Sequence, residues 1–359
     1  MKIFAATCSS FTPKFFLLRC FLAAVTLLAI HTNVVAEATT VRIGIPNVSS
    51  DVGFFIADKK GYFRQEGLNV TFTSFNSAAK MMAPLGAGQL DVGGGTVSAG
   101  LYNAVARGIH LKIVADKGSI KPGYGFSSLL VRKDHVDGGR YKSWGDLKGM
   151  KVAIGASGTG TASALNEALK KGGLKYKDVD VVDMAFPQHV LAFANKAIDA
   201  SITNEPTVTR AVKDGVAVRV AGNDVFYPDQ QTAVVLYGGE FIKNQPEAAR
   251  KFMRAYIRAI RDYNDALKDG KIAGPNADEI IAILTEYTAI KDASIYRVMT
   301  PNACDPDGHV NVKSLHKDFD FFKEQGLIEG KVTVEQAIDN SFAEAVLKEL
   351  GPYRPKKAK

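Results

Sequence analysis

The chain has 359 residues, of which 46% are hydrophobic and 23% are charged. This length is enough for two domains with their own cores, and the composition excludes disordered and fibrous proteins. The formal net charge is +8, but basic and aromatic residues are not interleaved as in single-strand-binding proteins, so we expect no nucleic-acid partner.

The N-terminal segment, residues 1–36, has the pattern of a secretory signal peptide. Basic residues precede the apolar run CFLAAVTLLAI (20–30), and VVA (34–36) follows after a short polar step. We predict cleavage after Ala36 and a periplasmic location. A lipoprotein is not expected, because a basic residue and not a small one precedes Cys20.

Cleavage removes three positive charges and two of the three cysteines, so the net charge falls to +5 and Cys304 remains alone. A lone cysteine forms no intramolecular disulfide, and we expect it to be a buried apolar residue. The histidines lack metal-ligand spacing, and no His-x-x-x-His, Cys-x-x-Cys or G-x-S-x-G motif occurs. We therefore expect no catalytic residue, metal or cofactor. Residues 351–359, which end in RPKKAK, are expected to form a basic, solvated tail.

Short apolar runs alternate with helical segments along the mature chain, which predicts an α/β protein with largely parallel sheets. Strands are expected in VRIGIP (41–46), LNVTFTSF (68–75), LDVGGGTVSAG (90–100), LKIVAD (111–116), SSLLVRKD (127–134), MKVAIGA (150–156), VDVVDMAF (179–186), IDASITNEP (198–206), VAVRVAG (216–222) and TAVVLYGGEF (232–241). Beyond them, helices are expected over 246–270, 276–288, 292–299, 312–325 and 333–350.

Two glycine-rich turns each join a strand to a helix, GGGTVSAG (93–100) and GASGTGTAS (155–163). The second has the glycine spacing of a phosphate-binding loop, but Thr161 and Ala162 replace the lysine and the magnesium-binding hydroxyl, so we expect no nucleotide. Ligands of open α/β sheets bind beyond the carboxyl ends of the strands, where both turns lie. Helix-end N–H groups and hydroxyls there suit a small monoanion or a neutral polar group.

Five stretches carry a resemblance to a known family: KKGYFRQEGLNVTF (59–72), PLGAGQLDVGGG (84–95), WGDLKGMKVAIGASGT (144–159), AIDASITNEPTVTRAVKDG (197–215) and FIKNQPEAARKFMRAYIRAI (241–260). In this order they resemble the periplasmic solute-binding subunits of ABC importers for nitrate, taurine, alkanesulfonates and thiamine-pyrimidine precursors. The resemblance implies the bilobal type II periplasmic-binding-protein fold: two α/β lobes joined by a hinge, with a helical C-terminal extension. Lobe 1 would comprise 41–128 and 238–350 and lobe 2 would comprise 129–237, with crossings near Ser128 and Tyr237.

The resemblance also implies a function. The lobes would close on a small organic solute, and a membrane permease with a separate cytoplasmic ATPase would receive it from a monomeric binding protein. Two alternatives stay open: a periplasmic sensor subunit, and an enzyme like the thiamine-pyrimidine synthases, although their cysteine-rich motif is absent. The sequence does not choose between a sulfonate, an aromatic carboxylate and a pyrimidine-like ligand.

The resemblance places the ligand at the strand ends. The turn residues expected to contact it are Gly95, Thr96, Ser98, Ser157, Thr159, Gly160 and Thr161, although tight turns, N-caps and close packing would also explain them. The other candidates are Asn47, Phe54, Ser77, Phe186, Asn204 and Glu205. Phe54 and Phe186 would line the cleft or belong to the core. Glu205 would accept hydrogen bonds from an amine or amidine, or would stabilise the start of a helix.

Overall fold

The structure, a computed structural model, describes residues 37–356. The expected signal peptide and its cleavage site at Ala36 lie outside the described residues. From Ala38 onward the chain forms one compact unit. Within the described range, no helix is both long enough and apolar enough to cross a membrane.

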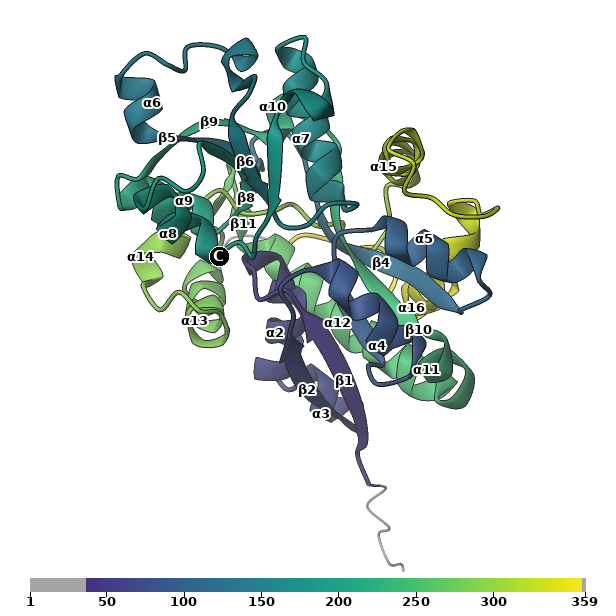
Figure 1. The fold of residues 1–359 in the computed structure, drawn as a ribbon. Helices are drawn as coiled ribbons and strands as arrows, with labels where there is room; N and C mark the ends of the chain where they lie inside the picture. Colours follow the sequence, from purple (N-terminus) through teal and green to yellow (C-terminus); the bar gives the residue numbers. More distant parts are fainter. Residues whose placement is uncertain (1–36, 357–359) are drawn as a thin grey trace, which may run out of the picture. The chain divides into compact units, whose positions relative to one another are not determined.

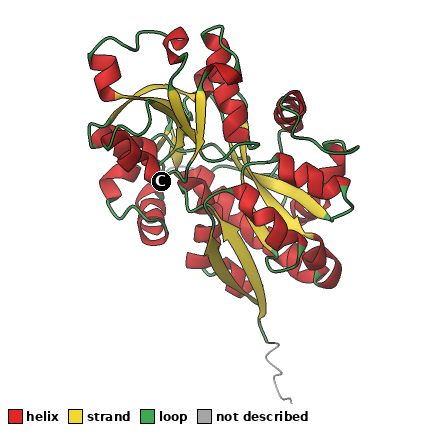
Figure 2. Ribbon diagram, viewed as in Figure 1, coloured by secondary structure: helices red, strands yellow, loops and turns green. Residues whose placement is uncertain are grey.

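Two five-stranded sheets organise this unit, and helices flank both of them (Figures 1 and 2). In spatial order, the first sheet contains β2 (Leu68–Ser74), β1 (Thr39–Ile45), β3 (Val92–Gly95), β10 (Gln231–Gly238) and β4 (Leu111–Ser119). The second contains β7 (Asp180–Asp183), β6 (Lys151–Ile154), β8 (Ala200–Asn204), β5 (Ser127–Arg132) and β9 (Ala217–Gly222). Each sheet combines parallel and antiparallel pairs, and this confirms the expected bilobal α/β fold.

The chain crosses between the two sheets twice. Residues 120–126 lead from β4 to β5, close to the expected crossing at Ser128. The return crossing occupies residues 223–230, and the whole of β10 then pairs with β3 and β4 of the first sheet. The return therefore precedes the expected position at Tyr237, because the apolar run 232–241 is a strand of lobe 1.

Helices cover the sheets of both lobes. Before the first crossing they are α2 (Val52–Lys59), α3 (Tyr62–Gln65), α4 (Met82–Gly86) and α5 (Ala99–Ala106). In lobe 2 and the return crossing they are α6 (Lys133–Asp137), α7 (Gly160–Lys171), α8 (Gln188–Ala194), α9 (Thr207–Lys213) and α10 (Asn223–Phe226). After β10 follow α11 (Gly239–Asn244), α12 (Pro246–Ala266), α13 (Ala277–Tyr287), α14 (Ala293–Val298), α15 (Val312–Glu324) and α16 (Ser341–Leu350). Short 3-10 helices lie at Ser49–Asp51 (η1), Ala78–Met81, Trp144–Leu147, Tyr176–Asp178 and Glu335–Ala337.

Helix α12 is the central helix of lobe 1. Proline occupies its first turn, and the expected apolar stripe of Phe252, Tyr256, Ile260 and Tyr263 is buried against α2 and its neighbours. The helix ends at Ala266, and the small hairpin of β11 (Leu267–Lys268) and β12 (Lys271–Ile272) follows it.

The C-terminal third differs from the expectation in two places. The single helix expected over 333–350 is a 3-10 turn followed by α16. The tail is also anchored as far as it is described: Tyr353 donates its hydroxyl to Asp265, and Lys356 pairs with Asp262 at 2.7 Å. These contacts explain why residues 351–356 are not simply a solvated tail.

Helix α15 extends the contact between the lobes. It belongs to the segment after β10 but contacts α7 of lobe 2. Its phenylalanines pack on aromatic rings of both lobes, with Phe319 against Tyr102 and Phe321 against Tyr176. One continuous hydrophobic cluster therefore includes residues of both lobes.

Candidate ligand-binding cleft

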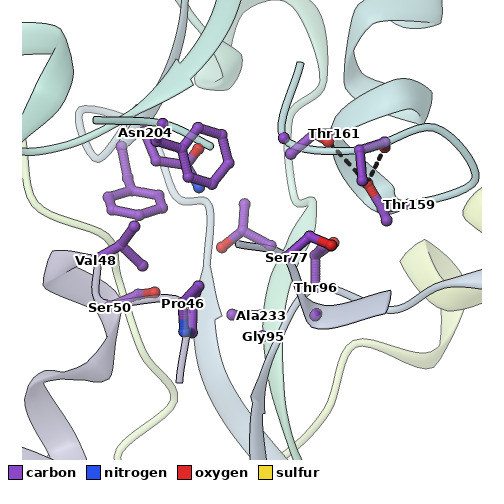
Figure 3. Close-up of a pocket in the computed structure, with 16 residues that line it drawn as sticks. Pro46, Val48, Ser50, Ser77, Gly95, Thr96, Thr159, Thr161, Asn204 and Ala233 are labelled. Carbon is purple, nitrogen blue, oxygen red and sulfur yellow. Dashed lines mark hydrogen bonds between the residues drawn. The ribbon is translucent and has the colours of Figure 1, made fainter. Parts of the chain in front are cut away.

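A narrow cavity lies between the two lobes at the ends of their strands (Figure 3). The cavity has a volume of about 30 Å³. Its sixteen lining residues are Pro46, Val48, Ser50, Ser77, Ala78, Gly95, Thr96, Phe126, Gly155, Ala156, Thr159, Thr161, Phe186, Asn204, Thr232 and Ala233. Both lobes and the first crossing segment contribute to this wall.

The lining is uncharged and has two unlike ends. Figure 3 shows Thr159 and Thr161 on one side, Val48 and Asn204 on the other, and Ser77 and Thr96 between them. Val48 belongs to a small apolar cluster with Phe126 and Phe186. The cavity is therefore rich in hydroxyls at one end and apolar and aromatic at the other.

The turn that precedes α7 supplies the hydroxyl end, but its hydroxyl hydrogens are already used. Thr159 Oγ1 donates to the carbonyl oxygen of Ala156 at 2.7 Å, and it lies 2.8 Å from Thr161 Oγ1. Because a hydroxyl has one hydrogen, Thr161 must be the donor in the second bond. Thr161 Oγ1 therefore offers lone pairs to the cavity and not the donor that the sequence pattern suggested.

Glycines allow the walls of the cleft to approach closely. A Cβ on Gly155 would lie 2.7 Å from the ring of Phe186, and a Cβ on Gly95 would lie 2.6 Å from that of Ala78. These glycines therefore serve close packing, which was one explanation of the turns. Gly95 also lines the cavity, so close packing and a place in the site are combined there. Its neighbour Thr96 has a buried hydroxyl with no hydrogen-bond partner among the described residues.

Seven sequence-predicted residues line this cavity: Ser77, Gly95, Thr96, Thr159, Thr161, Phe186 and Asn204. Phe54 does not, because it is fully buried in the core of lobe 1 against Phe252 and Tyr256. Of the two alternatives for Phe54, the structure supports the core, since α2 directs this ring toward α12.

Ser98 and Ser157 have other roles. Ser98 caps α5 by accepting a hydrogen bond from the N–H of Leu101 at 3.2 Å. The exposed Ser157 donates its hydroxyl to Asp183 at 2.7 Å. Neither side chain lines the cavity, so their expected ligand contacts are not part of the site.

Glu205 follows Asn204 directly but points away from the cavity. Its carboxylate accepts hydrogen bonds from the N–H and the hydroxyl of Thr209, both at 2.9 Å, and from the N–H of Thr300 at 3.3 Å. Burial raises the pKa of Glu205 to about 7. Its expected contact with a ligand amine is thus replaced by contacts at the start of α9 and across the lobes.

Asn47 lines a different groove. Its backbone has a φ of 56°, and its side chain lies near Pro187, Arg210 and Ile290. The left-handed conformation turns this side chain out of the cavity that the next residue, Val48, enters. The prediction from its place after β1 was therefore one residue out.

Backbone hydrogen bonds join the lobes on both flanks of the cavity. On one flank, Ala99 N–H donates to Gly158 at 2.8 Å and Gly160 N–H donates to Val97 at 3.1 Å. A side chain at Gly160 would collide with the hydroxyl of Thr96, so this glycine permits the contact without lining the cavity. On the other flank, Ser49 donates from its N–H and its hydroxyl to the carbonyl oxygen of Glu205.

A buried carboxyl group also lies beside the first of these flanks. Asp318 of α15 accepts a hydrogen bond from the Tyr227 hydroxyl at 2.8 Å, and its other oxygen lies 3.1 Å from the position of a Cβ on Gly160. Burial raises the pKa of Asp318 to about 7. Gly160 is the first residue of α7, so the carboxyl group lies close to the positive end of that helix.

The candidate residues did not include Ser50, Phe126 or Thr232. Ser50 lies in the polar run NVSSD, and its neighbour Asp51 forms a buried ion pair with Lys117 at 2.7 Å. This ion pair joins residues 66 positions apart, so no local sequence pattern reveals it. Thr232 lies at the start of β10, whereas the candidates were sought beyond the carboxyl ends of strands.

The comparisons with known proteins agree with this architecture. A nitrate-binding protein from Synechocystis PCC 6803 has the same fold, with a TM-score of 0.72, 14% identity, and coverage of 88% of this chain and 90% of that one. A desulfurization enzyme shares it at a TM-score of 0.58 and 13% identity, with coverage of 87% and 99%. The fold alone therefore does not separate binding from catalysis.

Sequence relatives are more specific. A binding protein of Brucella abortus is 30% identical over 243 residues, which are 67% of this chain and 68% of the relative. An ABC transporter periplasmic binding protein of Brachyspira hyodysenteriae is 28% identical over 327 residues, with coverage of 85% and 89%.

These relatives, together with the two lobes and the cleft at their strand ends, identify the chain as a substrate-binding component of the ABC-importer class. Residues 35–274 match the model of the NMT1-like family, and the chain belongs to that family.

Proposed function

We propose that the protein is the periplasmic substrate-binding subunit of an ABC importer, and that it carries a small, uncharged solute with a flat ring. The observation that carries this proposal is the chemistry of the lining: six hydroxyl side chains, one amide and two phenylalanines, with no acid or base among the sixteen residues. Such a cavity satisfies a neutral polar ring by hydrogen bonds and ring contacts.

An anionic solute is less well served by this cavity. A desolvated sulfonate or carboxylate needs a cation or several donors, because its burial is otherwise costly. The buried cation nearest to the lining, Lys117, is already paired with Asp51. The positive end of α7 faces Asp318 as well, and any ionisation of that carboxyl offsets the helix dipole. These contacts favour the pyrimidine-like ligand over the sulfonate and the aromatic carboxylate.

The transport cycle follows from the fact that residues of both lobes line the cavity. The cavity is complete only when both lobes are in contact, so a solute that bridges them binds the closed form more tightly than the open one. A membrane permease then receives the closed, loaded protein as a monomer, and a separate cytoplasmic ATPase drives uptake. A periplasmic sensor would use the same closure, and the genes beside this one distinguish the two roles.

Catalysis finds no support in the cleft. General acid–base chemistry requires a titratable group within reach of the ligand, and none lines the cavity. The nearby His189 is fully buried, and burial lowers its pKa to about 4 while its ring bonds Thr203 and Met184. The described residues also contain no cluster suited to a metal ion.

A thermal-shift screen of the mature protein tests the proposal. The compounds are neutral pyrimidines and pyridines, matched aromatic carboxylates, and alkanesulfonates. A ligand at about 100 times its Kd stabilises a protein by ~2.7 kcal/mol, which is a clear shift. We expect the neutral ring compounds to raise the melting temperature. A shift with sulfonates or carboxylates alone would contradict the ligand class, and turnover of a ligand would contradict the binding role.

A further inference from the structure

We propose that a second groove, the hinge groove, binds a small amphipathic monoanion, and that its occupant holds the cleft closed. The hinge groove lies between α9 of lobe 2 and the segment from β12 to Thr300 of lobe 1. Its volume of about 530 Å³ is within the range of ~300–1,000 Å³ that is usual for ligand sites. Binding at this groove is independent of the proposed function, whereas its effect on the cleft rests on the proposed closure of the lobes.

The hinge groove and the cleft lie on opposite faces of the same segments. In lobe 2, Asn204 lines the cleft, whereas the next residue, Glu205, lines the hinge groove. In the first crossing, Phe126 lines the cleft, whereas Gly125 accepts a hydrogen bond at 3.0 Å from Arg219, a residue of the hinge groove. The backbone of these segments therefore separates the two sites.

This arrangement links the hinge groove to the movement of the lobes. Both lobes supply its walls, with Val212 on α9 and Val298 on α14, two helices that lie side by side (Figure 1). A rotation about the crossings that opens the cleft moves these walls toward each other, because they lie on the other side of the axis. A molecule held between them resists this rotation, so it binds the closed form more tightly and raises its population.

The hinge groove is rich in positive charge, unlike the uncharged cleft. Three cations line it, Lys213, Arg219 and Lys271, against one carboxyl group, that of Glu205. Lys213 forms an ion pair with Asp292 at 2.7 Å. Within residues 37–356, no carboxylate lies within ion-pair distance of the other two cations.

Neutral groups hold these two cations in place. Arg219 donates to Ser128 Oγ at 2.9 Å and to the carbonyl oxygen of Gly125 at 3.0 Å. Lys271 donates to the carbonyl oxygen of Val298 at 2.5 Å. Such partners orient a cation without neutralising it, and a guanidinium group binds a carboxylate particularly well. The polar part of the groove therefore favours an anion.

The single carboxyl group of the lining opposes an anion only weakly. Glu205 is 2% exposed, and its oxygens accept hydrogen bonds from Thr209 and from the N–H of Thr300. Burial raises the pKa of Glu205 to about 7, although the charge of Arg219 acts in the opposite direction. Below pH 7 most of this group is therefore uncharged.

The apolar part of the hinge groove defines the rest of the ligand. The side chains of Val212 and Val298 are 43% and 58% exposed, and an alkyl chain between them would remove this surface from water. A carboxylate at Arg219 with an alkyl chain along the valines satisfies both parts of the groove. The ligand class is thus a medium-chain carboxylate, which the uncharged cleft does not suit.

The test of the site is calorimetric titration of the mature protein with octanoate, and with octan-1-ol as the neutral match. Arg219→Gln removes the cation that has no acid partner. Arg210→Gln is the matched control, because this arginine also belongs to lobe 2 but lines another groove. Val298→Trp fills the hinge groove from an exposed position. Melting temperatures show whether each variant is folded.

We expect wild type to bind octanoate more tightly than octan-1-ol. Arg219→Gln should weaken octanoate binding about tenfold or more, because a hydrogen bond to a charged group is worth ~1.5–3 kcal/mol, whereas Arg210→Gln should not change it. Val298→Trp should abolish binding by occupying the space. A folded Arg219→Gln protein with wild-type affinity, or wild type that does not bind octanoate, would overturn the site.

Small-angle X-ray scattering tests the link to closure. Octanoate should reduce the radius of gyration of wild type but not that of Arg219→Gln at the same concentration, and Val298→Trp should reduce it without octanoate. Binding of octanoate with an unchanged radius would overturn the link to the cleft. The screen for cleft solutes can fail without affecting these results, because octanoate binding at Arg219 does not require an occupied cleft.

Discussion

The cleft and the contacts that flank it are built from opposite kinds of side chain. The cleft contains hydroxyl, amide, apolar and aromatic groups and no charge. A buried carboxyl group lies at each flank and contacts the opposite lobe. Glu205 of lobe 2 accepts a hydrogen bond from the N–H of Thr300, and Asp318 of α15 lies beside Gly160 of α7. Titratable carboxyl groups are thus placed where the lobes meet and not where a solute would lie. Ligand choice and lobe contact should therefore respond to different substitutions.

The largest effect is expected from blocking a flank at a residue that does not itself line the cavity. Gly160→Val places a branched side chain against Thr96 and Asp318, so the lobes cannot meet as they do here. If the closed form falls to about 1% of molecules, the apparent Kd rises about 100-fold. Titration with a ligand found in the screen measures this loss. A folded variant with wild-type affinity would show that closure does not need this contact.

Two phenylalanines that the sequence could not tell apart should fail in different ways. Phe54→Ala opens a cavity in the core of lobe 1 and should cost about 3–5 kcal/mol of unfolding free energy. Phe186→Ala removes a wall of the cleft and should weaken a ring-bearing ligand about tenfold or more, at ~1.5–3 kcal/mol for a buried ring. Chemical denaturation and titration of both variants separate the two. Equal losses of stability would remove the distinction between core and cleft.

The flanks should also make stability depend on pH. Asp318 and Glu205 have pKa values raised to about 7 by burial, against about 4 in an unfolded chain. Between about pH 4 and pH 7 the unfolded state has released these protons and the folded state has kept them, so the free energy of unfolding falls as the pH rises. Asp318→Asn and Glu205→Gln should each reduce this fall, as denaturant titrations across that range would show. An unchanged slope in both variants would mean that neither group holds its proton.

The smallest effect is expected at the exposed edge of the α7 turn. Ser157→Ala removes one hydrogen bond to Asp183 at the surface and should change the unfolding free energy by less than about 0.5 kcal/mol and the ligand affinity not at all. A marked loss of affinity would return Ser157 to the site and enlarge the cleft beyond its present lining.

The fold was largely predictable because its elements have strong local signals. Alternating apolar runs gave the strands, and the spacing of Phe252, Tyr256, Ile260 and Tyr263 gave the central helix. The lobe boundary at β10 was missed because an apolar run does not reveal which sheet it joins. The anchored tail was missed because its contacts with Asp262 and Asp265 link segments about 90 residues apart.

The sequence predicted residues of the site only where they lie at the end of a strand or the start of a helix. Ser77, Thr96, Thr161 and Asn204 line the cavity, as their positions after strands or at helix starts suggested. Position alone could not give direction, because Asn204 and its neighbour Glu205 face opposite ways. Nor could it give polarity: the Thr161 hydroxyl is turned into an acceptor by Thr159, a bond that only the folded turn reveals.

Native mass spectrometry of the protein purified from its own periplasm, without refolding, tests the central claim most directly. A binding protein that closes on its solute often retains part of it, and the released compound can be identified by its mass and charge. We predict a neutral, nitrogen-containing aromatic compound at one molecule per chain, and its loss from the Gly160→Val variant. A sulfonate, a carboxylate or an inorganic anion in its place would contradict an uncharged cleft built for a neutral ring.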